Sequence, residues 1–298
     1  MSVLRDNINS GPSELRKILK NGFCVAPGVF NGVSAILAER SGFNALYLSG
    51  SGVAGNMGLP DLSVTTLTEV AEEARRITAV TRLPLIVDVD TGFGETINVI
   101  RTVREMEHAG ASAIHIEDQV LPKRCGHLNG KRIVPEDDMV LKIKAAVSAR
   151  KNRDFVIIAR TDARSVNGLD DAIERSREYL RAGADMIFTE ALESRSEFER
   201  FASEVKAPLL ANMTEFGKTP FIKASEFQEM GYRFVIFPVT LFRIAAKAMD
   251  DALEALKVQG TQEGIINNMM TRKEQYEVIN YDFYQDFDKN IARRKLKN

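Results

Sequence analysis

Three consecutive stretches decide the fold: LPLIVDVD at residues 83–90, NVIRTVREMEHAG at 98–110 and AIHIED at 113–118. The first and third are nearly continuous apolar runs, which are typical of strands covered on both faces. The middle stretch repeats apolar residues at helical spacing, at Val99, Val103 and Met106, and a glycine ends it. A strand, a helix and a second strand in this order predict a parallel βαβ unit.

The same alternation extends over most of the chain. Strand-like runs are found at residues 23–27, 45–50, 83–90, 113–118, 155–163, 186–191, 208–213 and 233–238, with helix-like segments such as 65–81, 136–150 and 170–183 between them. Eight such units in about 240 residues fit an α/β fold, the closed (β/α)8 barrel of TIM type. A doubly wound open sheet is the alternative, and it is disfavoured because polar residues follow nearly every strand instead of one switch point.

The end of the chain has a different composition. We expect the barrel to occupy residues 1–257, with 241–257 as its last helix, and a C-terminal helical extension to occupy 258–298. The extension is too rich in Met, Tyr and Phe to stay disordered throughout. We therefore expect it to pack on the barrel or on a neighbouring subunit. Its basic cluster, Arg293-Arg294-Lys295-Lys297, is interpreted as solvated.

Composition excludes several classes of partner. The chain has 40 Lys and Arg against 41 Asp and Glu, a net charge of -1, which does not indicate nucleic-acid binding. No run of apolar residues has the length of a membrane span. The two cysteines, Cys24 and Cys125, do not form a disulfide framework, and residues 1–20 lack the apolar core of a secretory signal. We expect a cytoplasmic protein without nucleic-acid or membrane partners.

Polar side chains follow the predicted strands at a spacing of two, which places them on one face of each strand. Active sites of such barrels lie at the carboxyl ends of the strands. The residues are Ser49 and Ser51, Asp88 and Asp90, His115 and Glu117, Arg160 and Asp162, Glu190, and Asn212 and Thr214. We expect them to converge on one site.

Carboxylates among these residues suggest a metal ion. Asp88, Asp90 and Glu117 are hard oxygen donors, which favour Mg²⁺, with Mn²⁺ as a substitute. The alternative is a set of acids paired with arginines such as Arg160. A zinc site at Cys125 and His127 is disfavoured, because a C-x-H spacing is not that of structural zinc sites.

The stretch Lys123-Arg124-Cys125-Gly126-His127 places a thiol among cations. Nearby cations lower the pKa of a thiol toward neutrality, so we expect Cys125 to exchange protons with small carboxylic acids. The surrounding loop, 119–131, is polar and contains glycine, and we expect it to close over a substrate. The glycine-rich loop 49–58 lacks the ending of a P-loop, and its amides are expected to hold a carboxylate.

These motifs resemble those of the isocitrate lyase/phosphoenolpyruvate mutase superfamily. The similarity covers nearly the whole chain, and it includes Tyr47-Leu48-Ser49-Gly50, Asp88-Val89-Asp90-Thr91-Gly92, His115-Ile116-Glu117, Lys123-Arg124-Cys125-Gly126-His127, Ala159-Arg160-Thr161-Asp162 and Asn212-Met213-Thr214. The Lys-Arg-Cys-Gly-His form and the short chain are most similar to the 2-methylisocitrate lyases. The resemblance implies a (β/α)8 barrel, a Mg²⁺ cofactor, and a homotetramer whose C-terminal helices are exchanged between subunits.

The resemblance also implies roles for individual residues. Asp88 and Asp90 match the metal positions, with Asp61 and Glu117 in the outer shell. Cys125 matches the catalytic position, and Tyr47, Lys123, Arg124 and His127 complete the catalytic group. The substrate-binding positions are Ser49, Gly50, Ser51, Gly126, Arg160, Glu190, Asn212, Thr214, Arg243 and Arg272. Ser51 departs from the Ser-Gly-Gly form that is common in the lyases, and its hydroxymethyl group would narrow the pocket.

The implied reaction is a retro-aldol or Claisen-type cleavage of 2-methylisocitrate, a tricarboxylic acid, to pyruvate and succinate. A base, either Tyr47 or a metal-linked carboxylate, removes the hydroxyl proton, and Cys125 protonates the succinate carbon. Isocitrate, which lacks one methyl group, is the alternative substrate and would give glyoxylate. Three rival functions are phosphonate chemistry and oxaloacetate decarboxylation or hydrolysis, neither of which needs Cys125, and a non-enzymatic barrel.

Overall fold

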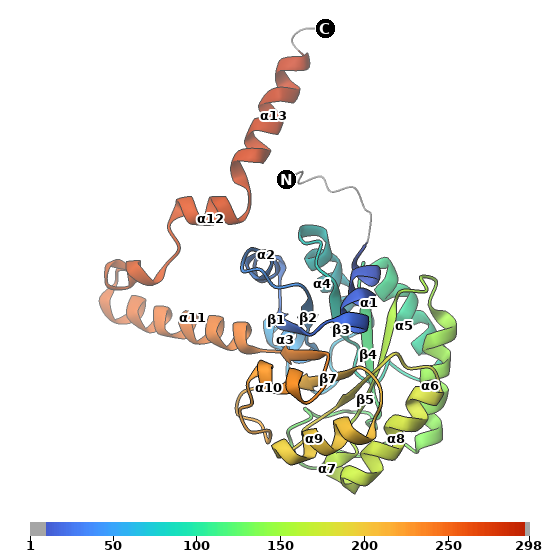
Figure 1. Cartoon of the computed structure of the whole chain (residues 1–298). Coiled ribbons are helices and arrows are strands. Elements are labelled where there is room, and N and C mark those ends of the chain that lie inside the picture. Colours follow the sequence, from blue (N-terminus) through green and yellow to red (C-terminus); the bar gives the residue numbers. More distant parts are fainter. Residues whose placement is uncertain (1–9, 296–298) are drawn as a thin grey trace.

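The structure is a computed structural model that describes residues 10–295. Within this range eight parallel strands close into a barrel in chain order, with the first beside the last (Figure 1). They are β1 (Cys24–Val29), β2 (Leu46–Leu48), β3 (Leu85–Asp88), β4 (Ala113–Glu117), β5 (Val156–Thr161), β6 (Met186–Thr189), β7 (Leu209–Asn212) and β8 (Phe234–Phe237). Each overlaps one predicted run, so the (β/α)8 prediction is confirmed and the open sheet is excluded.

Most helices cover the outside of the barrel, and the first packs against its interior layer (Figure 1). They are α1 (Gly11–Asn21), α2 (Gly32–Arg40), α3 (Gly50–Asn56), α4 (Leu67–Val80), α5 (Thr96–His108), α6 (Glu136–Ala149), α7 (Arg164–Asn167), α8 (Leu169–Arg181), α9 (Arg195–Glu204) and α10 (Ala224–Glu229). Local signals fix their ends: Thr66 and Glu69 form a reciprocal capping box at the start of α4, which satisfies amides that have no helical partner.

Two apolar layers hold the barrel together. One lies between strands and helices, and the other fills the barrel interior, where Leu15 of α1 also packs. Interior residues such as Ile86, Ile158 and Phe188 precede a polar residue by two positions. Because side chains alternate along a strand, this spacing directs the polar residue to the same inner face, one layer nearer the carboxyl end.

The glycine-rich segment after β2 differs from the expected loop. Residues 50–56 form α3, with Ser49 at its N-cap. The amide of Gly50 donates to Asp88 Oδ2 over 3.1 Å. This amide therefore holds a carboxylate of the protein itself, and binding of a ligand carboxylate by the segment stays a prediction.

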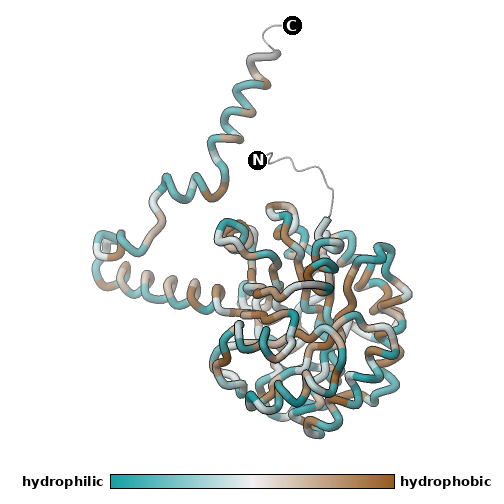
Figure 2. Tube along the Cα trace, viewed as in Figure 1, coloured by the Kyte–Doolittle hydropathy of each residue, from teal (hydrophilic) through white to brown (hydrophobic). Residues whose placement is uncertain are grey.

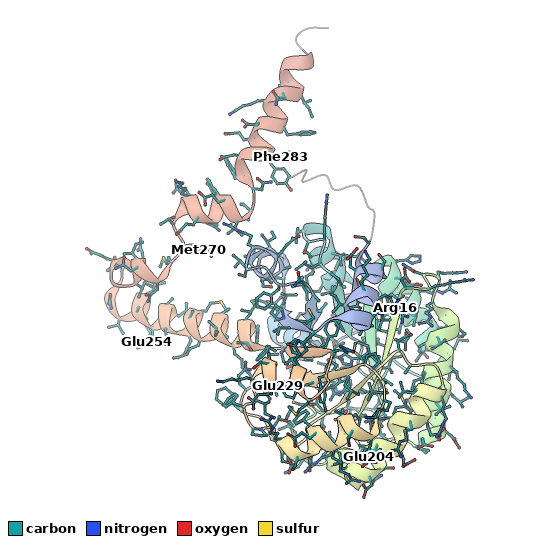
Figure 3. All side chains as sticks on the ribbon, viewed as in Figure 1. Arg16, Glu204, Glu229, Glu254, Met270 and Phe283 are labelled. Atoms are coloured by element: carbon teal, nitrogen blue, oxygen red, sulfur yellow. The ribbon has the colours of Figure 1, made fainter. Side chains whose placement is uncertain are left out.

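The last part of the chain leaves the barrel. Here α11 (Thr240–Gln259), η1 (Glu263–Asn268), α12 (Arg272–Val278) and α13 (Tyr281–Lys295) form what we call the C-terminal arm, residues 240–295. The helix expected over 241–257 does form, but none of its residues is buried, and it projects away from the strands (Figure 1). Figure 2 shows hydrophobic positions along the arm, and large apolar side chains there, such as the labelled Met270, are exposed (Figure 3).

Beyond the start of α11, the arm comes close to the barrel again at α12 and the beginning of α13. A cavity of about 1010 Å³ lies between this part of the arm and α2, and its lining includes Val33, Ile36, Val278 and Tyr281. The side chains of the basic cluster at 293–297 lie outside the described residues. None of the helices in the described part of the chain combines the length and apolarity needed to span a membrane.

Candidate active site

A cavity of about 60 Å³ lies at the carboxyl ends of the strands. Predicted site residues make up most of its lining: Tyr47, Ser49, Ser51, Asp61, Asp88, Lys123, Cys125, Gly126, His127, Arg160, Glu190, Asn212, Thr214 and Arg243. The volume is about that of two water molecules in the liquid, which is small for an organic acid. Lys123, Cys125, Gly126 and His127 of loop 119–131 form part of the lining, and closure of this loop over a substrate stays a prediction.

Strand register explains why the charged residues meet. Asp88 of β3 is aligned with His115 of β4, and Glu117 of β4 is aligned with Arg160 of β5. Neighbouring strands lie about 4.8 Å apart, so inward-facing residues at aligned positions touch. The structure thus brings together the residues that the sequence places tens of positions apart.

Arg160 is the centre of the buried charges. Its guanidinium lies 3.0 Å from Glu117 Oε2, donates to Asp162 Oδ2 over 2.9 Å, and lies 3.3 Å from Glu190 Oε2. Burial acts to lower the pKa of Arg160, but the three carboxylates outweigh it and raise the pKa well above its ordinary value. Arg160 also lies over the ring of Phe188, 5.2 Å from the ring centroid. It is a permanent cation that can face an anionic ligand.

The acids at the carboxyl end of β3, Asp88 and Asp90, are tightly held. Asp88 Oδ1 accepts from the amide of Asp90 over 3.1 Å, and Lys123 Nζ lies 3.0 Å from Asp90 Oδ1 and also pairs with Asp61. Burial, followed by the charge of Asp88, raises the pKa of Asp90 to about 6 against the opposing effect of Lys123. These carboxylates repel one another, and a single lysine is their nearest counter-charge.

The donor set fits a hard divalent cation. Asp90 Oδ1 and both carboxylate oxygens of Glu117 are buried. Lys123 lies 3.0 Å from Asp90 Oδ1 and Arg160 lies 3.0 Å from Glu117 Oε2, whereas Glu117 Oε1 has no hydrogen-bond partner within residues 10–295. The described chain has no group of three or more metal-ligating residues. Mg²⁺ does not need one, because it commonly takes one or two carboxylates and completes its shell with water and substrate. The pairing of acids with Arg160, predicted as the alternative to a metal, is also present, at Glu117.

The structure corrects the expectation for the thiol. Lys123 points to Asp61 and Asp90, and the exposed side chain of Arg124 donates to Asn129 O on the outside of the loop. Burial therefore dominates and raises the pKa of Cys125. The prediction that neighbouring cations lower the pKa of this thiol is wrong, and Cys125 is a protonated acid near neutral pH.

His127 fastens the loop to two other strand ends. Its Nδ1 accepts from the amide of Lys218 over 3.0 Å, which leaves the ring proton on Nε2, 3.1 Å from Glu190 Oε1. Two glycines permit this close approach. A Cβ at Gly126 would lie 2.3 Å from Glu190 Cγ, and one at Gly217 would lie 2.5 Å from His127 Nδ1.

Tyr47 and His115 form a second buried pair, with the phenolic oxygen 2.8 Å from Nε2. Burial lowers the pKa of His115 to about 4. Burial, and then the charge of Asp88, raise the pKa of Tyr47 well above 10.0. Both side chains are therefore neutral near pH 7 and act as a hydrogen-bonded pair below the acids.

Some expected residues lie elsewhere. Arg124 does not line the cavity, and Arg272 lies at the start of α12 in the C-terminal arm, where its side chain is exposed. Phe188, Pro238 and Val239 line the cavity but were not anticipated from the sequence. Phe188 could have been predicted, because it precedes Glu190 by two positions and therefore faces the same side of the strand. The contacts of Pro238 and Val239 depend on how the chain leaves β8.

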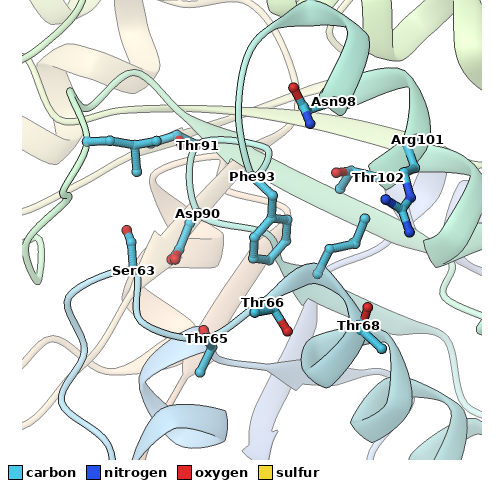
Figure 4. A pocket seen from close by; sticks show the side chains of 12 residues that line it. Ser63, Thr65, Thr66, Thr68, Asp90, Thr91, Phe93, Asn98, Arg101 and Thr102 are labelled. Atoms are coloured by element: carbon cyan, nitrogen blue, oxygen red, sulfur yellow. The ribbon is translucent and has the colours of Figure 1, made fainter.

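A second cavity of about 380 Å³ lies beside Asp90, at the starts of α4 and α5 (Figure 4). Hydroxyl groups are frequent in its lining, which includes Ser63, Thr65, Thr66, Thr68, Thr91 and Thr102. Asp90 lines this space, and Lys123 lines the first cavity. The Lys123–Asp90 ion pair therefore lies between the two cavities.

Comparison with known proteins identifies the family. A family model described as phosphoenolpyruvate phosphomutase matches residues 15–257. The chain belongs to the phosphoenolpyruvate mutase/isocitrate lyase superfamily. Among similar members, the 2-methylisocitrate lyase of Aeropyrum pernix is 55% identical, over 94% of this chain and 91% of that protein.

Solved structures of the superfamily share the whole architecture. A 2,3-dimethylmalate lyase superposes with a TM-score of 0.89 at 40% identity and covers 94% of this chain and 95% of its own. An oxaloacetate acetylhydrolase in complex with the inhibitor 3,3-difluorooxalacetate gives 0.89 at 36% identity, over 96% and 99% of the two chains. Superfamily membership thus extends beyond the matched range into the C-terminal arm.

Proposed function

We propose that this protein is a carbon–carbon lyase that cleaves 2-methylisocitrate to pyruvate and succinate. The observation that carries the proposal is Cys125, a thiol with a raised pKa in the lining of a cavity that also contains Arg160 and Glu190. A neutral acid at that place suits protonation of a carbanion. The 55% identity to a 2-methylisocitrate lyase supports the choice of substrate.

Substrate binding falls to cations and hydroxyl or amide groups in the lining. Arg160 and Arg243 supply positive charge to the carboxylates, and Ser49, Ser51, Asn212 and Thr214 supply hydrogen bonds. Arg243 is braced for this role, since it donates to Glu215 Oε2 over 2.7 Å. Fixed donors of this kind select charge and orientation before the bond breaks.

The bond-breaking step transfers two protons and moves two electron pairs, that of the O–H bond into the new C=O bond and that of the C–C bond to carbon. A carboxylate of the site removes the proton of the substrate hydroxyl, the hydroxyl carbon becomes the ketone of pyruvate, and the C–C electron pair passes to the succinate carbon. Cys125 gives its thiol proton to that carbon, and the proton taken at the start restores the thiol. Tyr47 stays protonated because of its raised pKa, so it orients the hydroxyl and does not serve as the resident base.

Asp88 and Asp90 would hold Mg²⁺ or Mn²⁺, with Asp61 and Glu117 in contact with its waters. The buried Glu117 Oε1, which has no hydrogen-bond partner within the described residues, supports this assignment. The bound ion would lower the pKa of the substrate hydroxyl and neutralise charge on the adjoining carboxylate. If the assignment is right, exhaustive chelation abolishes turnover and added Mg²⁺ restores it. Full activity in chelator would remove the metal from the proposal.

We also propose a cytoplasmic homotetramer in which the C-terminal arm is exchanged between subunits. The exposed apolar residues of the arm, such as Leu253 at 66% exposure, support burial by a second copy. Exchange would also give Arg272 a route to a neighbour's cavity, which it does not reach in its own chain. The two free cysteines support a reducing compartment.

A substrate panel tests the reaction. Purified protein with Mg²⁺ is offered 2-methylisocitrate, isocitrate, 2,3-dimethylmalate and oxaloacetate, and pyruvate, glyoxylate, propionate and oxalate are measured. We expect kcat/KM to be highest for 2-methylisocitrate, by roughly 10- to 200-fold over isocitrate, since one methyl group is worth about 1–3 kcal/mol. A higher kcat/KM for oxaloacetate would instead assign a hydrolase, and silence on every acid would sink the proposal.

A further inference from the structure

One buried lysine of the loop lies outside the cavity that it helps to cover. The side chain of Lys131 is 2% exposed and is not part of the cavity lining. Its ammonium donates to Asp162 Oδ1 over 2.6 Å and also to the carbonyl oxygen of Gly126. A buried ammonium that uses one of its donors on a loop carbonyl fixes the position of that carbonyl.

The carbonyl of Gly126 belongs to the peptide unit that joins Gly126 to His127. This peptide is trans, so its C=O and N–H point in opposite directions from one rigid plane. The N–H, which is that of His127, acts on the Cys125 thiol and lowers its pKa against the larger effect of burial. Lys131 therefore holds one edge of the peptide plane, and the opposite edge carries the N–H that acts on the sulfur.

The other partner of Lys131 is part of the barrel wall. Asp162 is fully buried, its Oδ2 accepts from Arg160 Nε over 2.9 Å, and its amide donates to Asp118 Oδ1 over 2.8 Å. Lys131 thus connects the loop to β5 and its following residues. The connection does not depend on His127 or Lys123, which fasten the loop at other points.

The peptide plane has little freedom on its inner side. A Cβ at Gly126 would lie 2.3 Å from Glu190 Cγ and 2.7 Å from Arg160 Nη2. The peptide unit therefore packs against Glu190 and Arg160 on one side, and the Lys131 ammonium binds its carbonyl oxygen on the other. Loss of the ammonium would let the plane rotate, and the N–H would then turn away from the sulfur.

We propose that Lys131 is a positioning residue for Cys125. It holds the Gly126–His127 peptide against the barrel wall, so that the His127 amide meets the sulfur and the thiol faces the cavity. The proposal rests on the proposed function in one respect, namely that Cys125 is the proton donor. Its test therefore uses a readout that does not require turnover.

The test is Lys131→Met, which keeps the length of the side chain and removes its donors. The rate of alkylation of Cys125 by iodoacetamide is followed against pH in the full-length protein, with the modified peptide identified by mass because Cys24 is also present. We expect the pH midpoint to rise by about one unit, the effect of losing one hydrogen bond to a charged group. In the same variant kcat for 2-methylisocitrate should fall about tenfold or more, with KM changed less than about threefold.

Arg175→Met is the matched control. Arg175 is also a buried cation that donates to a main-chain carbonyl, that of Val134 over 2.9 Å, but it does not touch the peptide beside Cys125. The Arg175→Met variant should have a lower Tm. Its alkylation midpoint should equal that of the wild type, and its kcat should stay within about twofold. If Lys131→Met does not fold, Lys131→Gln, which keeps an N–H donor, should shift the midpoint in the same direction by less.

An unchanged midpoint in folded Lys131→Met or Lys131→Gln would overturn the proposal, as would an equal shift in Arg175→Met, which would reveal a general effect of stability. Failure of the wild-type protein to cleave any acid would sink the proposed function but would leave the alkylation result readable. The two failures are therefore distinct.

Discussion

The carboxyl end of the barrel buries charge, whereas the C-terminal arm exposes apolar surface. The side chains of Arg160, Glu117 and Glu190 are 6%, 0% and 3% exposed, while Met270 and Tyr284 in the arm are 55% and 53% exposed. Both arrangements reverse the usual preference of these residue types. In the barrel the cost of burial is offset by ion pairs within one chain, and for the arm we propose that a second copy of the chain covers the apolar surface.

The largest effect expected from the barrel face is the loss of its acid. Cys125→Ser should lower kcat by about 10³-fold, within the usual range for a missing general acid, with little change in stability. Pyruvate release under saturating substrate is the measurement.

In the wild type kcat should fall as pH rises through the raised pKa of Cys125, because the protonated form is the active one. Cys24→Ala, which changes the buried thiol of β1, should keep kcat within about twofold; near-native turnover in Cys125→Ser would refute the role.

The next effect concerns the stability of paired charges. Arg160→Met leaves Glu117, Asp162 and Glu190 without their common cation, and the free energy of unfolding in urea should fall by about 3–5 kcal/mol. Lys247→Met is the control from the arm, where the lysine pairs with Asp251 but its side chain is 69% exposed, and it should cost less than about 1 kcal/mol. An equal decrease in the free energy of unfolding in both variants would show that the buried ion pairs of the barrel stabilise the protein no more than the exposed pairs of the arm.

Steric fit on the barrel face gives a smaller effect. Gly126→Ala would force a methyl group to 2.3 Å from Glu190 Cγ, and displacement of the loop should lower kcat/KM by about 10- to 100-fold. In Gly52→Ala the new methyl would have its nearest contact at 3.6 Å, with Ser49 Cβ. This control should retain wild-type kinetics, and the prediction fails if both variants behave alike.

The smallest effect on the single chain is expected in the arm. Leu253→Glu places a charge on the exposed face of α11 and should change the free energy of unfolding of the isolated chain by less than about 0.5 kcal/mol. It should nevertheless lower the assembled mass in sedimentation velocity, because a charge cannot be buried between subunits without a partner. Glu254→Ser, one residue along the same helix, should leave the mass unchanged. An unaltered mass in Leu253→Glu would remove this face from the interface.

Most of the barrel could be predicted because its signals are local. Apolar runs such as 155–163 and helix stops such as Gly110 each depend on a few neighbouring residues. The direction of Asp88, Arg160 and Glu190 into the barrel followed from strand alternation alone. The course of residues 241–257 could not be predicted in the same way, since an amphipathic helix does not specify whether it covers its own barrel or another chain.

The amino-acid sequence by itself determined which residues are able to bind, donate protons or hold a metal, because those abilities are properties of side-chain type and short-range pattern. The tertiary structure decided their electrostatic state. The cations beside Cys125 in the sequence turn toward Asp61 and Asp90 or to the outside of the loop, so burial raises the pKa of the thiol where the sequence suggested the opposite. The physical reason is that electrostatic energies depend on distance and on access to water, and only the folded chain sets these.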